Sequence, residues 1–271
     1  MKVAALQTVS GTALQPNLDA AYALLQQAAA QGAELALLPE HFALLGQRDT
    51  DKFAIAEAFA PEGGGTIQRF LADAAREFKL WLVGGSIPLL TDDPQKVSNT
   101  TLAYSPAGVC VARYDKIHLF HFDNGSERYD EAQVLLPGTA PVAFDMVSRA
   151  GEPWRVGLSI CYDLRFPELY RALAADLLLV PSAFTFTTGQ AHWELLLRAR
   201  AIENQAYVLA AAQGGEHENG RRTWGHSLLA GPWGEMLAQH ADGAAVVLGD
   251  CLPARLQQVR EQLPALAHRV L

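Results

Sequence analysis

The fold is decided by the stretch Trp154-Arg155-Val156-Gly157-Leu158-Ser159-Ile160-Cys161-Tyr162-Asp163-Leu164-Arg165-Phe166-Pro167-Glu168-Leu169. The residues up to Ile160 are typical of a buried strand, and Pro167 suits a first helical turn because its missing N–H is not needed there. Cys161 therefore lies at an elbow between a strand and a helix. Free N–H groups at such a place lower the pKa of a thiol and can bind an oxyanion. The alternatives are a catalytic thiol or one more buried small hydrophobic residue.

The same plan of strand, helix and strand occurs twice in the chain. In the first half it comprises a strand at 3–7, a helix at 16–30 and the octet Ala-Glu-Leu-Ala-Leu-Leu-Pro-Glu at 33–40. In the second half it comprises a strand at 156–160, a helix at 167–174 and the octet Ala-Asp-Leu-Leu-Leu-Val-Pro-Ser at 175–182. Further strands at 81–86 and 207–212 precede hairpins with turns at 105–108 and 231–234. Apolar strands joined in this way indicate right-handed crossovers between buried parallel strands.

Each half thus supplies parallel strands, covering helices and a closing hairpin. Two sheets with helices on only one side can bury their bare faces against each other. The sequence therefore predicts an α/β fold, a four-layer α-β-β-α sandwich with two internal pseudo-repeats. A single doubly wound sheet is the alternative.

The remaining segments are predicted to belong to the same unit, so that residues 1–271 form a single domain. The glycines at 63–65 are expected to form a loop inside it, ahead of a helix at 66–78. Further helices are predicted at 191–204 and 253–262. Residues 264–271 are apolar enough to pack on something, such as a second subunit.

Composition excludes several classes of partner. A net charge of −8 argues against nucleic acid and anionic membranes as principal partners. No run approaches about 18 apolar residues, so we expect no membrane span. The chain enters a strand directly after Met1 without a secretory signal, which predicts a cytoplasmic protein. Its three cysteines form no Cys-x-x-Cys pair, and its histidines have no convincing ligand partners, so neither a metal nor a cofactor is expected.

Two further residues are candidates for catalytic groups that would act together with the Cys161 thiol. Glu40 follows an apolar strand and a proline, where poor solvation would raise its pKa toward the range of a general base. It can instead be a helix-capping or loop glutamate. Lys116 lies among the apolar residues of Tyr-Asp-Lys-Ile-His-Leu-Phe at 114–120, where it could stabilise an oxyanion. A surface lysine beside Asp115 is the alternative reading.

Three segments resemble the signature segments of the nitrilase superfamily, the carbon–nitrogen hydrolases with a Glu-Lys-Cys triad. They are Leu-Leu-Pro-Glu at 37–40, the segment at 114–120 and Cys-Tyr-Asp-Leu-Arg-Phe-Pro-Glu-Leu at 161–169. The resemblance extends from Val3 to about Gly249. It implies the four-layer sandwich, usually paired as a homodimer through the sandwich helices.

The resemblance also implies roles for particular residues. Cys161 would be the nucleophile, Glu40 the general base and Lys116 the oxyanion stabiliser, aided by the backbone N–H of Tyr162. Glu131, ahead of the Pro-Gly pair at 137–138, would orient Lys116 and the substrate. Arg165 would bind a substrate carboxylate, to which its planar fork is suited, and Tyr162 and Phe184 are further predicted substrate-binding residues.

Within the superfamily, the sequence is most similar to the branch of deaminated glutathione amidases. The stretch 192–203 is typical of this branch and of ω-amidases, and the segments 210–214, 225–227 and 232–234 favour the former. The resemblance implies hydrolysis of a small carboxylate-bearing amide, deaminated glutathione to α-ketoglutarate and cysteinylglycine, through a cysteine thioester. The alternatives are an ω-amidase acting on α-ketoglutaramate or α-ketosuccinamate, and an inactive scaffold or binding protein. The loop at 121–128 matches no family pattern and lies near the expected pocket, so it bears on the substrate.

Overall fold

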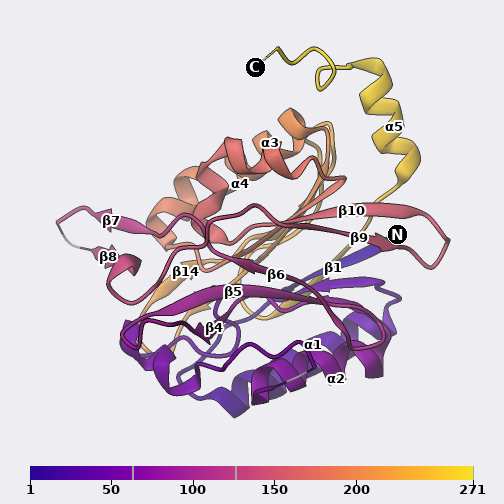
Figure 1. Ribbon diagram of the computed structural model, residues 1–271. Coiled ribbons are helices and arrows are strands. Elements are labelled where there is room, and N and C mark those ends of the chain that lie inside the picture. Colours follow the sequence, from indigo (N-terminus) through magenta and orange to yellow (C-terminus); the bar gives the residue numbers. More distant parts are fainter. Residues whose placement is uncertain (63, 126, 271) are drawn as a thin grey trace.

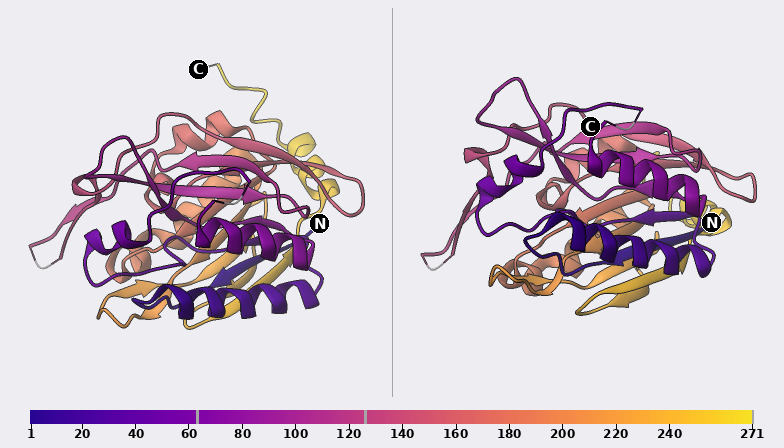
Figure 2. Two further views of the ribbon diagram at one scale, coloured as in Figure 1. Left: turned by 60° about the horizontal axis from the view of Figure 1, so that its bottom comes forward. Right: turned by 90° about the horizontal axis from the view of Figure 1, so that it is seen from below.

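The computed structural model describes residues 1–62, 64–125 and 127–270. Helices, two stacked sheets and further helices follow one another in layers (Figure 1). The turned views show the helices of the first half lying side by side along one outer face (Figure 2). The predicted α-β-β-α sandwich is confirmed, and the alternative of a single doubly wound sheet is wrong. Gly63 and Leu271, which belong to the predicted loop and tail, lie outside the described residues.

The first sheet is built mainly by the N-terminal half. Its strands, in spatial order, are β17 (Ala245–Asp250), β1 (Lys2–Gln7), β2 (Leu35–Leu37), β3 (Trp81–Val83), β5 (Val97–Tyr104) and β4 (Ile87–Leu90), with β6 (Cys110–Asp115) paired to β5. Strands β1, β2 and β3 are parallel. The helices α1 (Leu14–Ala30) and α2 (Thr66–Phe78) cover its outer face.

The second sheet repeats this plan with residues of the C-terminal half. Its strands, in spatial order, are β16 (Met236–His240), β15 (Ser227–Ala230), β12 (Tyr207–Ala212), β11 (Leu177–Ser182), β10 (Pro153–Leu158) and β9 (Ala143–Val147). Strands β10, β11 and β12 are parallel. The helices α3 (Pro167–Leu173) and α4 (Phe186–Asn204) cover its outer face. The two predicted pseudo-repeats are therefore confirmed.

Shorter elements complete the structure. The 3-10 helices are η1 (Asp49–Ile55), η2 (Glu131–Gln133) and η3 (Cys161–Arg165). Small hairpins pair β7 (His121–Asp123) with β8 (Arg128–Asp130), and β13 (Gly214–Glu216) with β14 (Arg222–Trp224). The C-terminal helix α5 (Pro253–Gln262) is the predicted one. Most of the chain beyond it, up to Val270, is exposed.

Alternation along the strands separates two apolar layers. In β1, Val3 and Ala5 face the other sheet, whereas Ala4 and Leu6 face the helices α1 and α2. The same alternation occurs in β2. Because successive side chains of a strand point to opposite faces, an unbroken apolar run supplies both layers. This explains why the strands of both octets contain almost no polar residue.

Two features differ from the sequence-based expectation. Strand β17, from the second half, pairs antiparallel with β1, so the closing strand crosses to the first sheet. Helix α4 begins at Phe186 rather than at residue 191. Its first turn contains threonines and a glycine, which disfavour helix interiors, but the Thr185 side chain caps the helix by accepting a hydrogen bond from the Thr188 N–H.

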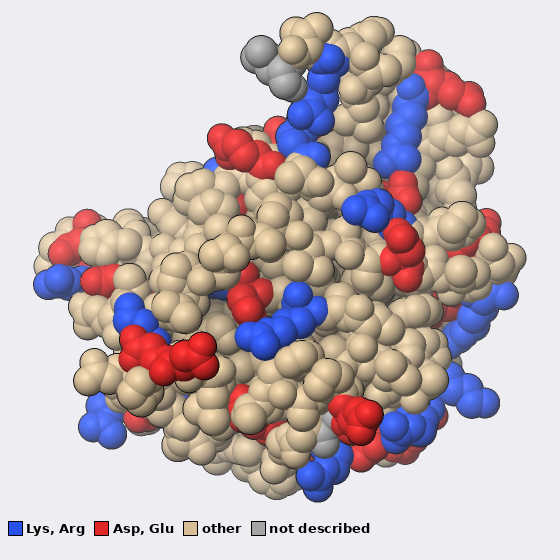
Figure 3. All heavy atoms as spheres, in the orientation of Figure 1, with Lys and Arg blue, Asp and Glu red and all other residues tan. Residues whose placement is uncertain are grey.

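On the described part of the face in Figure 3, acidic and basic side chains are interspersed rather than gathered by sign. Among the described residues, we find no helix with the length and hydropathy that a membrane crossing needs.

The packing between the sheets makes Leu35→Ala a test of the layer order. Leu35 is fully buried between the sheets, so its truncation should lower the free energy of unfolding by about 2–5 kcal/mol. Leu90→Ala, on β4 with 53% of its surface exposed, is the matched control and should cost less than about 0.5 kcal/mol. Urea unfolding of the purified variants measures both. Equal losses would contradict the layer assignment.

Candidate active site

Glu40, Lys116 and Cys161 lie together where three strands end. Glu40 follows β2, Lys116 follows β6 and Cys161 opens η3 after β10. Gly85 allows the close passage of the chain beside Glu40, because it has φ of +54° and a Cβ there would collide with the carbonyl oxygen of Pro39. Residues that are far apart in sequence thus form one cluster, as the sequence analysis predicted for this trio.

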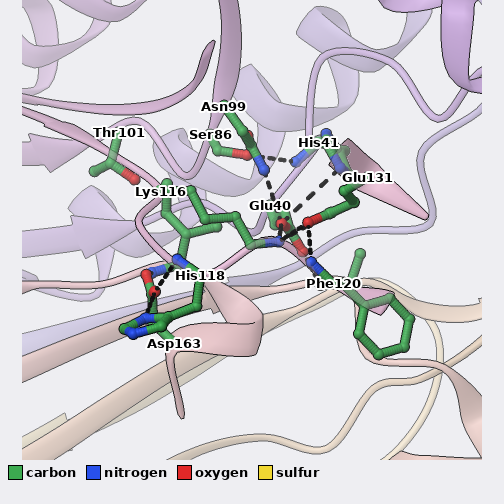
Figure 4. A network of polar contacts seen from close by, with 12 residues as sticks. Glu40, His41, Ser86, Asn99, Thr101, Lys116, His118, Phe120, Glu131 and Asp163 are labelled. Atoms are coloured by element: carbon green, nitrogen blue, oxygen red, sulfur yellow. Dashed lines mark hydrogen bonds and ion pairs between the residues drawn. The ribbon is translucent and has the colours of Figure 1, made fainter. Parts of the chain in front are cut away.

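A buried ammonium group joins two carboxylates. The Nζ of Lys116 lies 2.9 Å from Oε1 of Glu40 and 2.8 Å from Oε2 of Glu131 (Figure 4). Lys116 and Glu40 are almost inaccessible to solvent, with 1% and 2% of their side-chain surfaces exposed. The other partners of Glu131 include the backbone N–H of Phe120, which donates a 2.7 Å hydrogen bond. Glu131 therefore fixes both Lys116 and the chain that follows it.

The carboxylate of Glu40 is held from both sheets. Its Oε1 accepts a 2.9 Å hydrogen bond from the Asn99 side chain, which comes from β5 of the first sheet. Its Oε2 accepts a 2.9 Å hydrogen bond from the backbone N–H of Ala183, directly after β11 of the second sheet. Sequence reasoning missed Asn99. Its signal was the polar run Ser98–Thr101, which is buried inside a central strand.

Cys161 has a strained backbone and borders the same cavity as Glu40. Its φ is +51°, in the left-handed region that is costly for a residue with a Cβ. The thiol and the Glu40 carboxylate border the same cavity and interact electrostatically. Because Cys161 opens η3, the N–H of Tyr162 belongs to the first turn of that helix, where N–H groups lack helical partners. The geometry is that of a sharp turn between a strand and a helix.

The pKa values of this pair differ from the sequence-based expectation. Burial raises the pKa of the Cys161 thiol well above its usual value, and the neighbouring Glu40 carboxylate raises it further. Burial is the largest influence on the pKa of Glu40 and raises it, but the Lys116 ammonium and other neighbouring groups together outweigh burial and lower that pKa to about 2. The expected directions, a lowered thiol pKa and a raised carboxyl pKa, are therefore both wrong. The free site holds a carboxylate and a protonated thiol.

Asp163 fastens the elbow to the segment that carries Lys116. One carboxylate oxygen accepts hydrogen bonds from the backbone N–H of Ile160, at 2.9 Å, and from the hydroxyl of Tyr114, at 2.7 Å. The other accepts from the N–H of His118 and lies 2.7 Å from its Nδ1. Asp163 is completely buried. Sequence reasoning assigned Asp163 no role, although its position two residues after Cys161 was an available signal.

His41 and Glu131 form, with Glu40, the kind of group that could hold a metal ion. Their ligand atoms lie within 4.8 Å of one another. Burial lowers the pKa of His41 to about 4, so its imidazole is neutral. However, the Lys116 ammonium already bridges the two carboxylates, and a divalent cation beside it would meet strong repulsion. The expectation of a metal-free enzyme stays a prediction.

Cys161 lines two cavities. A cleft of about 650 Å³, the open solvent at its mouth included, is bordered by Glu40, Glu131 and several charged residues that sequence reasoning missed: Asp49, Lys52, Asp130, Arg221 and Arg222. A smaller pocket of about 220 Å³ is lined by all three predicted substrate-binding residues, Tyr162, Arg165 and Phe184. The Arg165 guanidinium carbon lies 5.5 Å from the centre of the Phe184 ring and 5.8 Å from that of Tyr162. The missed residues come from η1, from the end of β8 and from the start of β14 with the residue before it, which no sequence pattern tied to the strand ends.

The loop at 121–128 forms the hairpin β7–β8, apart from Ser126, which lies outside the described residues. The hairpin extends away from the sandwich (Figure 1). Its base reaches the cleft through Tyr129. The Tyr129 ring packs against Phe120, with ring centres 5.6 Å apart. The loop therefore borders the site, as expected from its position in the sequence.

Comparisons with known proteins show which relatives and solved structures this chain resembles. Two relatives match nearly the full chain. The deaminated glutathione amidase of Synechocystis sp. PCC 6803 is 42% identical, over 98% of this chain and 97% of its own length. The human ω-amidase NIT2 is 36% identical, over 99% of this chain and 94% of its own length.

Two solved structures have a similar fold. Saccharomyces cerevisiae Nit3, described as a member of branch 10 of the nitrilase superfamily, has a TM-score of 0.86 and 30% identity over 97% of this chain and 94% of its own. A variant of the amidase from Nesterenkonia sp. AN1, with acrylamide added at its active-site cysteine, has a TM-score of 0.78 and 29% identity over 97% of this chain and 98% of its own. The carbon–nitrogen hydrolase family model matches residues 2–261. The chain belongs to the carbon–nitrogen hydrolase family.

Proposed function

We propose that this protein hydrolyses a small carboxylate-bearing amide through a thioester on Cys161. The observation that carries the proposal is the buried ion pair of Glu40 and Lys116 next to the Cys161 thiol, whose pKa both groups influence. In this proposal Cys161 is the nucleophile, Glu40 the general base and Lys116 the oxyanion stabiliser. Glu131 positions Lys116. The acrylamide adduct of the Nesterenkonia amidase supports the assignment of the nucleophile.

The resting protonation states give the order of proton transfers. The resting site holds a protonated thiol beside the ionised Glu40 carboxylate, so the thiol proton passes to Glu40 as sulfur attacks the amide carbon. Lys116 and the N–H of Tyr162 then stabilise the oxyanion, each such donor contributing about 2.7–4 kcal/mol where measured in other enzymes. Glu40 then gives its proton to the leaving amine, which departs. Glu40 next takes a proton from a water molecule, whose oxygen attacks the thioester. The released sulfur takes the proton back from Glu40, which regenerates the thiol.

The proposed substrate is deaminated glutathione, cleaved to α-ketoglutarate and cysteinylglycine. The 42% identity to an amidase of that name supports it, as does the cleft, which has room for a leaving group larger than ammonia. An ω-amidase activity on α-ketoglutaramate or α-ketosuccinamate is the second candidate, favoured by the 36% identity to human NIT2. The intact cluster speaks against an inactive scaffold or binding protein.

A substrate panel tests this proposal. The purified protein should release cysteinylglycine from deaminated glutathione with a higher kcat/KM than it releases ammonia from α-ketoglutaramate or α-ketosuccinamate. Cys161→Ala should abolish every turnover and leave the far-UV circular dichroism unchanged. Separate assays for ammonia and for the dipeptide make the comparison. The reverse preference would replace the proposal with an ω-amidase, and full activity of Cys161→Ala would exclude the thioester.

Glu40→Gln separates the base from the electrostatics of the site. Hydrolysis should fall by roughly a hundredfold to ten-thousandfold, because the amide side chain cannot accept the thiol proton. The pKa of Cys161 should fall, because the anion that opposes the thiolate is gone and the Lys116 ammonium remains. The pH dependence of thiol alkylation measures that pKa, and thermal unfolding shows whether the variant is folded. An unchanged or higher thiol pKa would contradict the assigned coupling.

We further propose that the protein is a cytoplasmic homodimer and that residues 1–271 form one domain. Exposed apolar residues on the α4 side support the dimer: Leu195, Ile202 and Trp233 are 71%, 51% and 52% exposed. Leu195 and Ile202 are seven residues apart and so lie on one face of α4. The turn containing Trp233 is fastened to α4 by a hydrogen bond from Arg198 to the Gly234 carbonyl. Three free cysteines are compatible with a reducing compartment.

A charge on this face should separate the subunits. Leu195→Glu should lower the molecular mass measured by light scattering from that of a dimer to that of a monomer, because a buried unpaired carboxylate opposes association. Leu237→Glu is the matched control, since Leu237 is also exposed, at 45%, but belongs to β16. A wild-type protein that is monomeric at micromolar concentration would refute the proposal.

A further inference from the structure

Cys161 lies where the two cavities meet. The cleft and the smaller pocket share Phe120, Cys161, Ala183 and Thr185 as lining residues. An amide whose carbonyl carbon is attacked by the thiol therefore has space on both sides, one for its acyl part and one for its amine. The smaller pocket, with Arg165, can hold a short acyl chain that carries a carboxylate. The cleft then receives the leaving amine, and ammonia would leave most of it unused.

The charged groups of the cleft are not all engaged. Lys116 holds the carboxylates of Glu40 and Glu131. Arg221 lies 2.8 Å from Asp49. The carboxylate of Asp130 accepts a hydrogen bond from Gln133 and lies 3.8 Å from His121. Among the described residues, we find no hydrogen bond or ion pair for the two remaining cations, Lys52 and Arg222.

Lys52 and Arg222 belong to two different elements of the chain. Lys52 is half-buried on η1, and burial lowers the pKa of its ammonium group against the opposing effect of the Glu131 and Asp49 carboxylates, to which an arriving anion would add. Arg222 comes from β14, and its guanidinium carbon lies 3.8 Å from the centre of the Phe186 ring. Stacking on the ring fixes the plane of the guanidinium and leaves its N–H edge for a ligand.

We propose that Lys52 and Arg222 bind a carboxylate carried by the leaving amine, and so make the protein selective for amides with a carboxylate on each side of the scissile bond. Arg165 would bind the acyl carboxylate and these two cations the amine-side carboxylate. The inference rests on the proposed function, and it adds two specificity residues to it. It also gives the reason for a preference for a peptide-like leaving group over ammonia: ammonia cannot use either cation.

Two substrates that differ in one group test the inference. They are deaminated glutathione and the same molecule with its glycine carboxylate converted to a carboxamide. The double variant Lys52→Met/Arg222→Gln should lower kcat/KM for the acid by roughly tenfold to a hundredfold, the effect of losing charge-assisted hydrogen bonds. Its effect on the carboxamide should be less than about threefold, because a neutral amide gains little from either cation. Lys79→Met/Arg69→Gln removes the same charges from exposed positions outside the cleft and should change neither substrate.

Binding to Cys161→Ala keeps this test separate from turnover. Calorimetry should show that the acid binds more tightly than the carboxamide, and that the cleft variant removes the difference. An equal loss for both molecules, or no loss for either, would overturn the inference while leaving the hydrolase proposal in place. If binding discriminates between them but the wild type hydrolyses neither, the proposed function fails and the carboxylate site stands.

Discussion

The contact between the Lys116 ammonium and the Glu40 carboxylate is the constraint on which the rest of the site depends. It is buried between two sheets, and removing one partner of such a pair commonly costs about 3–5 kcal/mol, since the other charge is left without compensation. The contact keeps Glu40 ionised in a place where burial alone would protonate it. Burial, and after it the same carboxylate, keeps the proton on Cys161. The ion pair therefore acts, together with burial, on the protonation state of all three groups.

The sandwich fold explains why this pair can be assembled. Each sheet ends its central strands at the same place, and the side chains that follow those strands face the seam between the layers. Glu40 spans the seam, since it accepts hydrogen bonds from β5 of one sheet and from the chain after β11 of the other. Asp163 adds a second tie, between the elbow and the Lys116 segment. A shift of one sheet against the other would break both.

Sequence patterns were sufficient for the layers and for the trio, but not for the electrostatics. The apolar octets and the hairpin turns at 105–108 and 231–234 are repeated local patterns. The strands, the helices and the positions of Glu40 and Cys161 could therefore be predicted. The pKa directions could not, because they depend on which charge lies 2.9 Å from Glu40, a distance set by tertiary packing. Asn99 and the cations of the cleft were missed for the same reason. They come from a polar strand and from short elements whose neighbours have no sequence periodicity. The crossing of β17 to the first sheet likewise has no local signal.

The central claim is that a carboxylate, an ammonium group and a thiol act together to form a covalent intermediate. Mass spectrometry of the protein, acid-quenched during turnover of deaminated glutathione, tests it most directly. The account predicts a peptide containing Cys161 whose mass is increased by the α-ketoglutaryl group and is restored by hydroxylamine. The opposite result is steady turnover with no acyl group on Cys161, even in samples quenched rapidly at low temperature to preserve the intermediate. That result would contradict the account.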